Sequence, residues 1–179
     1  IPTMPQALQR AGYITYGIGK FHFMQTWPWG TPRGAGWDFL KNEEAMHRFG
    51  FDFVWETAGK QQMLQNYDHY CAYLEQKGLL EKYRDFIIQS GGGNGDTADH
   101  NYDQALPFPF DEEDYVDCVT GRVAREQLQA HDASKPFYMF VSFCGPHKPY
   151  DPPKRYMDMF PVLRSDDFVL EPGQALTQE

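Results

Sequence analysis

The fold is decided first by residues 12–22, which read Gly12-Tyr13-Ile14-Thr15-Tyr16-Gly17-Ile18-Gly19-Lys20-Phe21-His22. The β-prone run over residues 13–18 predicts a strand that is buried on both faces. Because side chains two residues apart point the same way on an extended backbone, Lys20 and His22 are expected to converge beside the end of this strand. Gly19 has no Cβ atom and lets an anionic ligand or another backbone come close. The pattern therefore predicts a cationic site that can hold a tetrahedral oxyanion.

The segment before this strand predicts a short helix over residues 2–11. Thr3 is the expected N-cap, Pro5 falls in the first turn, and Gly12 fits the C-terminal stop. Helix and strand are thus expected to follow one another directly, as in an α/β protein.

Further helices and a second strand are expected downstream. Residues 66–77 have the three-and-four spacing of an amphipathic helix that Gly78 can end, and residues 50–55 form a turn that leads into a short strand. Residues 85–109 have the least ordered pattern. Residues 111–131 give the clearest helix, with an acidic start that suits the helix dipole. Its inward stripe is expected to consist of Val116, Val119, Val123 and Leu128.

Residues 137–143 form a nearly continuous apolar run. Such a run is typical of a central, mainly parallel strand that helices cover on both faces. A further helix is expected to begin within residues 152–159. The predicted fold class is α/β, with a mainly parallel central sheet flanked by helices.

A second group of polar residues follows that apolar strand. In open α/β sheets, ligands bind at the carboxyl ends of the strands, which is where His147 and Lys148 fall. Pro146 and Pro149 fix φ on both sides of this pair and limit where the imidazole can point. His147 is therefore a candidate for the same site as Lys20 and His22.

Both motifs resemble the sulfatase family. Residues 12–22 resemble its second signature, residues 1–11 resemble the helix that leads into it, and residues 142–153 resemble its apolar strand followed by Pro-His-x-Pro. The resemblance implies a hydrolase of sulfate esters with an alkaline-phosphatase-like fold. It also implies a periplasmic or secreted location.

The resemblance assigns roles to individual residues. Lys20 would balance charge on the sulfate, His22 would hydrogen-bond a formylglycine nucleophile, and His147 would bind the ester oxygen and act as general acid. Lys148, at the variable position of the pattern, and Trp29, in a loop rich in Trp, Pro and Gly, are candidate substrate contacts. The loop tryptophans can stack on a sugar ring or cover the core, and both interpretations stay open.

Parts of the family pattern are missing from residues 1–179. The Asp pair that binds metal and the Cys-x-Pro-Ser-Arg or Ser-x-Pro-x-Arg motif that yields formylglycine are not found, and Cys71, Cys118 and Cys144 lack that context. We therefore expect residues 1–179 to be the central portion of a sulfatase catalytic domain, without its N-terminal nucleophile and metal segment or its C-terminal metal-ligand segment. Ca²⁺ would be a cofactor of the full-length enzyme, with ligands outside this chain. The isolated chain would be inactive, and the remaining segments of the parent would be its partners.

Composition limits the class of partner. A content of 41% apolar and 16% aromatic residues indicates a folded domain, and the net charge of −9 argues against nucleic acid as a partner. No apolar run is long enough to span a bilayer. An anionic substrate, either a small-molecule or a saccharide sulfate ester, would have to be held by a few local cations. Two alternatives remain: a phosphoester or phosphonate monoester hydrolase of the same superfamily, and a non-catalytic carbohydrate-binding remnant.

Two weaker patterns are interpreted as structural. Asp96, Asp99, His100 and Asp103 lack the spacing of a calcium loop and are expected to form a polar loop. The histidines without a partner pattern are expected at the surface; they are His47, His69 and His131.

Overall fold

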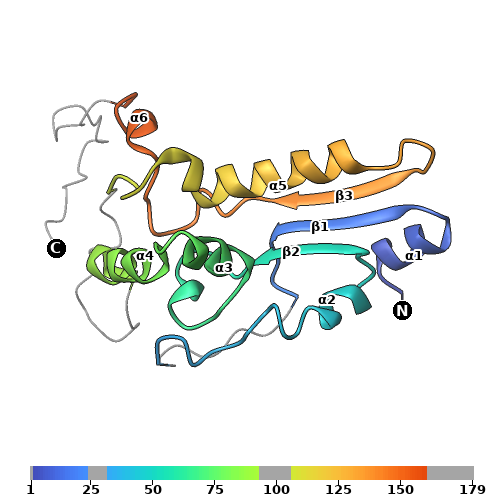
Figure 1. The fold of residues 1–179 in the computed structure, drawn as a ribbon, viewed down its shortest axis with the longest axis horizontal. Coiled ribbons are helices and arrows are strands. Elements are labelled where there is room, and N and C mark those ends of the chain that lie inside the picture. The colour runs from blue at the N-terminus through green and yellow to red at the C-terminus, as the bar shows by residue number, and fades with distance from the viewer. Residues whose placement is uncertain (1, 24–31, 93–105, 161–179) are drawn as a thin grey trace, which may run out of the picture.

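A three-stranded parallel sheet forms the centre of the structure. The computed structural model describes residues 2–23, 32–92 and 106–160. Its strands are β1 (Ile14–Lys20), β2 (Phe53–Thr57) and β3 (Phe137–Ser142), in the order β2-β1-β3. All three arrows point the same way in Figure 1, so the carboxyl ends of the strands meet at one edge. The predicted α/β class, with a parallel sheet flanked by helices, is confirmed.

The helices occupy the connections between the strands. The first helix connects directly to β1, and the others lie between β1 and β2, between β2 and β3, and after β3. The α-helices are α1 (Met4–Arg10), α2 (Glu44–Arg48), α3 (His69–Gln76), α4 (Leu80–Ile87), α5 (Val116–Ala130) and α6 (Lys154–Met157). Short turns add η1 (Gln62–Leu64), the π-helical η2 (Ile88–Gly92) and η4 (Glu112–Asp114).

Local sequence signals explain several of these boundaries. Thr3 caps α1 by accepting a hydrogen bond from the Gln6 backbone, and the Gln6 side chain binds back to the Thr3 N–H, which is a capping box. Gly12 and Gly78 both have positive φ, as expected for residues that end helices. The predictions of Thr3 as cap and of these two glycines as stops are confirmed.

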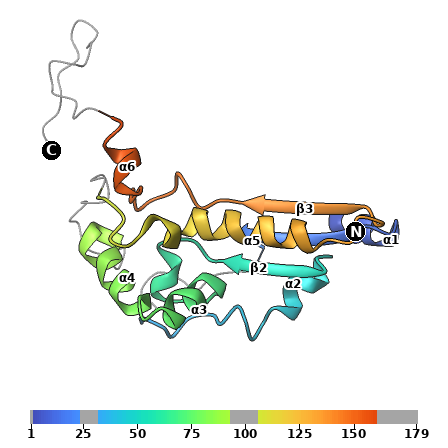
Figure 2. The same cartoon turned by 45° about the horizontal axis from the view of Figure 1, so that its top comes forward.

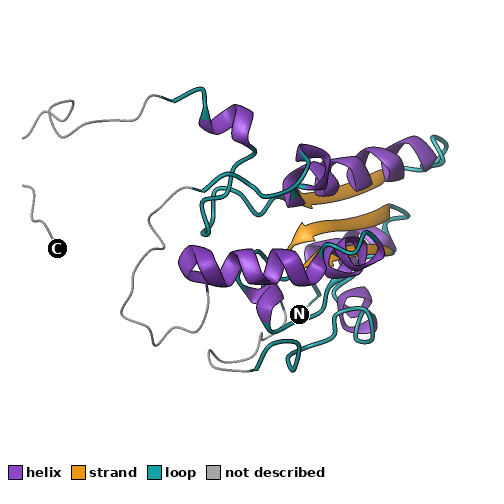
Figure 3. Ribbon diagram, turned by 60° about the vertical axis from the view of Figure 1, so that its left-hand side comes forward, coloured by secondary structure: helices purple, strands orange, loops and turns teal. Residues whose placement is uncertain are grey.

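The two faces of the sheet pack against different helices. The larger core lies between one face and helices α3, α4 and α5, and it includes Ile18, Trp55 and Tyr83. Figure 2 shows α5 running along the strands, and Figure 3 shows the strands between helices on two sides. The smaller core lies on the other face, where Met46 of α2 packs with Val54. Alternation along each strand separates these two sets of side chains.

Two predictions about these elements are wrong. β3 lies at the edge of the described sheet, not at its centre, and none of its residues is fully buried, because β1 occupies the central position. Leu128 is exposed, so the buried stripe of α5 is limited to its N-terminal half, with Val116 and Val119. Within residues 85–109, α4 continues to Ile87 and η2 follows it, but residues 93–105 lie outside the described residues, so the expected lack of order there stays a prediction.

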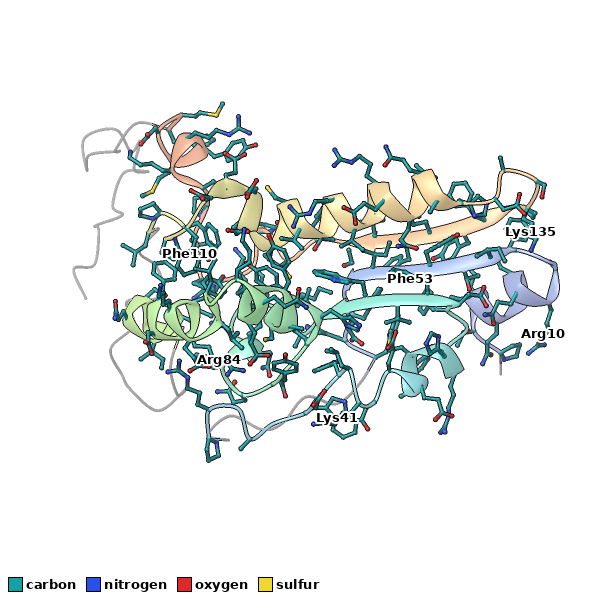
Figure 4. All side chains as sticks on the ribbon, viewed as in Figure 1. Arg10, Lys41, Phe53, Arg84, Phe110 and Lys135 are labelled. Carbon is teal, nitrogen blue, oxygen red and sulfur yellow. The ribbon has the colours of Figure 1, made fainter. Side chains whose placement is uncertain are left out.

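Different residues lie at the two ends of the sheet. Figure 4 shows Arg10 and Lys135 at the end where the strands begin and Phe110 near the opposite end.

In the described part of the chain, no helix is long and apolar enough to cross a membrane.

Candidate active site

The candidate site lies at the carboxyl edge of the sheet, where β1 meets its two neighbours. Gly19 pairs with Ser142 of β3, and Lys20 pairs with Thr57 of β2. Gly19 has φ +104°, and a Cβ atom there would lie 1.9 Å from the Ser142 carbonyl oxygen. The close approach that Gly19 permits is therefore that of another backbone, which is one of the two possibilities that its position predicted.

Lys20 is the last residue of β1 and is half-buried. Its side chain lies against Gly59, because a Cβ atom at Gly59 would be 2.8 Å from Lys20 Cε and 3.0 Å from Lys20 Nζ. Among the described residues, no carboxylate lies within ion-pair distance of the Lys20 ammonium. An unpaired ammonium supported by backbone is suited to bind an anion.

His22 lies within the electrostatic influence of Lys20 and His147. Partial burial of the imidazole lowers the pKa of His22, and the positive charges of Lys20 and His147 lower it further. The residue as a whole is exposed, so only part of the ring has lost its hydration. The structure thus brings together three of the predicted residues from the ends of two different strands.

His147 lies on the exposed loop after β3, and one of its ring nitrogens is occupied. Its Nδ1 atom is 2.8 Å from the Lys148 carbonyl oxygen. Because a carbonyl oxygen only accepts, we infer that Nδ1 carries a proton. Nε2 is then the nitrogen that can bind an anion when protonated and release a proton to a leaving group.

The start of the loop that carries His147 is tied to α5. Asp117 accepts hydrogen bonds from the backbone N–H groups of Cys144 at 2.7 Å and Gly145 at 3.0 Å. Asp117 lies in the first turn of α5, where a carboxylate also interacts favourably with the helix dipole. This contact fixes the direction in which the chain leaves β3.

The end of the same loop is tied to the segment after β2 by a buried ion pair. Lys60 Nζ donates to Asp151 Oδ1 at 2.5 Å, to the Pro149 carbonyl at 3.2 Å and to Tyr115 Oη at 2.7 Å. Tyr83 Oη donates to the other oxygen of Asp151 at 2.8 Å. Burial opposes the charge on Lys60, but the Asp151 carboxylate outweighs it and raises the pKa of Lys60. Burial raises the pKa of Asp151, although the Lys60 ammonium and the Tyr83 hydroxyl act against this rise, and the short contact favours the charged pair.

A second buried carboxyl group at this edge has a different environment. Glu56 pairs in register with Gly19, and its Oε1 atom has no hydrogen-bond partner among the described residues. Burial, and secondarily the negative charge of Asp68, raises the pKa of Glu56 to about 8. Glu56 is thus largely protonated at neutral pH. The carboxylate of Asp68, in contrast, accepts from the backbone of Ala58 and Cys71 and from Thr57 Oγ1.

The other predicted site residues are placed as follows. Lys148 is half-buried beside His147, whereas Trp29 lies outside the described residues. His47 is exposed, as predicted, but His69 and His131 are half-buried, so their surface prediction is wrong. Both make structural hydrogen bonds: His69 Nδ1 accepts from the Glu56 N–H, and His131 Nδ1 bonds Tyr16 Oη.

Calcium was expected only with ligands outside this chain. Across residues 2–23, 32–92 and 106–160, no three His, Cys, Asp or Glu side chains gather in a way that could hold a metal ion. The described residues therefore do not fit a metal centre. Asp96, Asp99, His100 and Asp103 lie outside the described residues.

Sequence reasoning missed Lys60, Asp117 and Asp151. The signal for Lys60 is nonetheless present, because Gly59-Lys60 follows β2 in the same way that Gly19-Lys20 ends β1. Both glycines have positive φ, +95° and +104°. No local pattern could have shown which of the two lysines has a carboxylate partner.

The carboxyl edge of a parallel sheet, where Lys20 and the two histidines lie, is the place at which open α/β sheets bind their ligands. Comparison with known proteins identifies the family. The family model described as Sulfatase matches residues 1–167. An arylsulfatase of Clostridium perfringens is 26% identical over 163 residues, which cover 88% of this chain and 29% of that protein. Arylsulfatase J of Mus musculus is 22% identical over 158 residues, which cover 88% of this chain and 21% of that protein.

The chain belongs to the sulfatase family. It spans less than a third of the length of these two curated relatives.

Proposed function

We propose that residues 1–179 form the central portion of a sulfatase catalytic domain and provide the part of the active site that holds the sulfate group. The observation that carries this proposal is the convergence of Lys20, His22 and His147 at one edge of the sheet. The protein has a net charge of −9, so the Lys20 ammonium and the two imidazoles stand against an acidic background. A site of this kind selects anions by local contacts.

Each residue has a distinct part in the proposed reaction. Lys20 offers its ammonium to the sulfate oxygens, and His22 donates a hydrogen bond once an anion favours its charged form. His147 uses Nε2 to bind the ester oxygen and to protonate the departing alkoxide. Positioned charges of this kind each contribute about two to three orders of magnitude in rate. Lys148, beside His147, and Trp29 would contact the organic part of the substrate.

The nucleophile and the metal come from other segments of the parent in this proposal. A formylglycine nucleophile and Ca²⁺ are implied by the family, and the described residues offer no metal centre. The isolated chain is therefore expected to hydrolyse no sulfate ester. Turnover of an aryl sulfate by the purified 179-residue chain would contradict this division of the active site.

The proposed substrate is a sulfate ester, with a sulfated saccharide as the favoured class. The names of both curated relatives support a sulfate ester over a phosphate ester. Sulfate and phosphate share tetrahedral geometry, so the two must be separated by experiment. The full-length parent should cleave 4-nitrophenyl sulfate with a higher kcat/KM than 4-nitrophenyl phosphate; the reverse order would favour a phosphoester hydrolase.

The decisive test is substitution of Lys20 in the full-length parent. Lys20→Ala should lower kcat by about two to three orders of magnitude, because Lys20 stabilises charge in the transition state. Lys82→Ala, on the exposed surface of α4, is the matched control and should leave kcat unchanged. An unchanged kcat in Lys20→Ala would remove Lys20 from the mechanism.

A further inference from the structure

The loop after β2 contacts both halves of the proposed sulfate site. Gly59 lies under the Lys20 side chain, and its neighbour Lys60 binds the loop that carries His147. We propose that the Gly59-Lys60 pair is the positioning element of the sulfate site, because it sets Lys20 and His147 relative to each other. This proposal rests on the proposed function of Lys20 and His147.

The contacts of Lys60 show that it acts through other residues and not on the substrate. An ammonium group has three hydrogens, and Lys60 uses them on Tyr115, Pro149 and Asp151. Its side chain is 2% exposed, and that of Asp151 is 1% exposed. The Lys60 ammonium also lies 4.9 Å from the centre of the Tyr115 ring. With no hydrogen left over and almost no exposure, Lys60 is a positioning residue.

The position of these contacts along the loop gives them their effect on His147. Pro149 follows His147 by two residues, so a hydrogen bond to its carbonyl restrains the backbone next to the imidazole. Asp117 restrains the loop on the other side, at Cys144 and Gly145. His147 therefore lies between two anchors, Asp117 on α5 and Lys60 on the loop after β2. Loss of either anchor frees a group that must be placed within a fraction of an ångström.

Gly59 connects the same segment to the Lys20 side chain. Because a Cβ atom at this position would overlap Lys20 Cε, the bare glycine backbone is the surface on which the Lys20 side chain rests. Lys60 is the next residue, so a shift of the His147 anchor also moves this surface. Lys20 and His147 are thus linked through two adjacent residues.

The test uses inorganic sulfate and NMR signals of the histidine rings in the 179-residue chain. Lys60→Met should shift the His147 ring signals in the absence of sulfate and weaken sulfate binding about tenfold, which corresponds to 1.4 kcal/mol. The His22 signals should also shift, but less than those of His147, because His22 feels the charges of both Lys20 and His147. Lys77→Met is the matched control: it breaks an ion pair with the buried Asp114 and should leave the His147 signals and the sulfate affinity unchanged.

The outcomes separate this proposal from the proposed function. A folded Lys60→Met chain with wild-type His147 signals would overturn the positioning role. If the wild-type chain binds no sulfate, the proposed function fails in that respect, while the His147 signals recorded without sulfate still decide the positioning role. If Lys60→Met does not fold, Asp151→Asn, which keeps the shape and removes the charge, decides it by the same His147 signals.

Discussion

Two Gly-Lys pairs at the same edge of the sheet have opposite environments. Lys20, at the end of β1, is half-buried and has no carboxylate partner among the described residues, whereas Lys60, after β2, is buried and bound to Asp151. Both follow a glycine with positive φ. The difference comes from Asp151, which lies about ninety positions after Lys60 in the chain. A Gly-Lys pair at a strand end therefore indicates a cation at the sheet edge, and its surroundings decide whether that cation binds a ligand or holds the structure.

The largest expected effect is on stability. Lys60→Ala should lower the free energy of unfolding by about 3–5 kcal/mol, because it leaves the Asp151 carboxylate buried without its partner. Lys20→Ala should change the free energy of unfolding by about 0.5 kcal/mol or less, since it breaks no ion pair within the described residues. Urea denaturation of the three proteins measures both values. Equal losses in the two variants would abolish the contrast between the lysines.

The next effect concerns the buried carboxyl group of Glu56, whose Oε1 atom has no hydrogen-bond partner among the described residues. Glu56 has a pKa of about 8 in the folded chain against an ordinary value of 4.5, so folding takes up a proton between these values. The free energy of unfolding should therefore fall as pH rises from about 4.5 to about 8, by about 4 kcal/mol. Glu56→Gln cannot ionise and should remove most of this decline.

Denaturation curves recorded from pH 5 to pH 8 test the Glu56 prediction. Glu126→Gln, at an exposed position on α5, is the control and should keep the wild-type slope. A wild-type slope in Glu56→Gln would mean that the decline has another source.

A smaller effect compares two glycines with positive φ. Gly59→Ala and Gly78→Ala should each cost about 1–2 kcal/mol of stability, because alanine disfavours left-handed backbone. A Cβ atom at Gly78 meets open space, but one at Gly59 overlaps the flexible end of Lys20. Only Gly59→Ala should therefore weaken sulfate binding as well, which calorimetric titration with sulfate can measure. Equal sulfate affinity in both variants would show that Gly59 does not support Lys20.

The smallest effect is on the titration of His22. Lys20→Met removes a positive neighbour that lowers the pKa of His22, so the pKa of His22 should rise. NMR titration of the His22 ring measures this change. Lys135→Met, at the opposite end of the sheet, is the control and should leave the titration unchanged (Figure 4). A constant His22 titration in Lys20→Met would place the two residues too far apart to share a ligand.

Local sequence patterns predicted where helices and strands occur better than they predicted which elements lie next to one another. The capping signal at Thr3 and the stops at Gly12 and Gly78 depend on a few adjacent residues, and the structure confirms them. The prediction that β3 lies at the centre of the sheet was wrong, because an apolar run has the same pattern in a central strand and in an edge strand.

The candidate site shows the same division. The alternation of side chains could indicate that Lys20 and His22 leave the same strand end, and parallel strands could bring His147 to that edge. The Lys60–Asp151 pair could not be predicted, because it joins residues 91 positions apart through a buried hydrogen bond. Partners that are distant in the chain are set by packing, which no short motif describes.

The edge position of β3 also has a practical consequence for handling the protein. Phe137 and Phe140 on this strand and Phe143 just beyond it are exposed, at 43%, 38% and 51%. Among the described residues, no strand pairs with the outer side of β3. Backbone groups free to pair, next to exposed aromatic rings, promote association between chains. Measurements on the isolated chain are therefore best made at several concentrations and extrapolated to dilute solution.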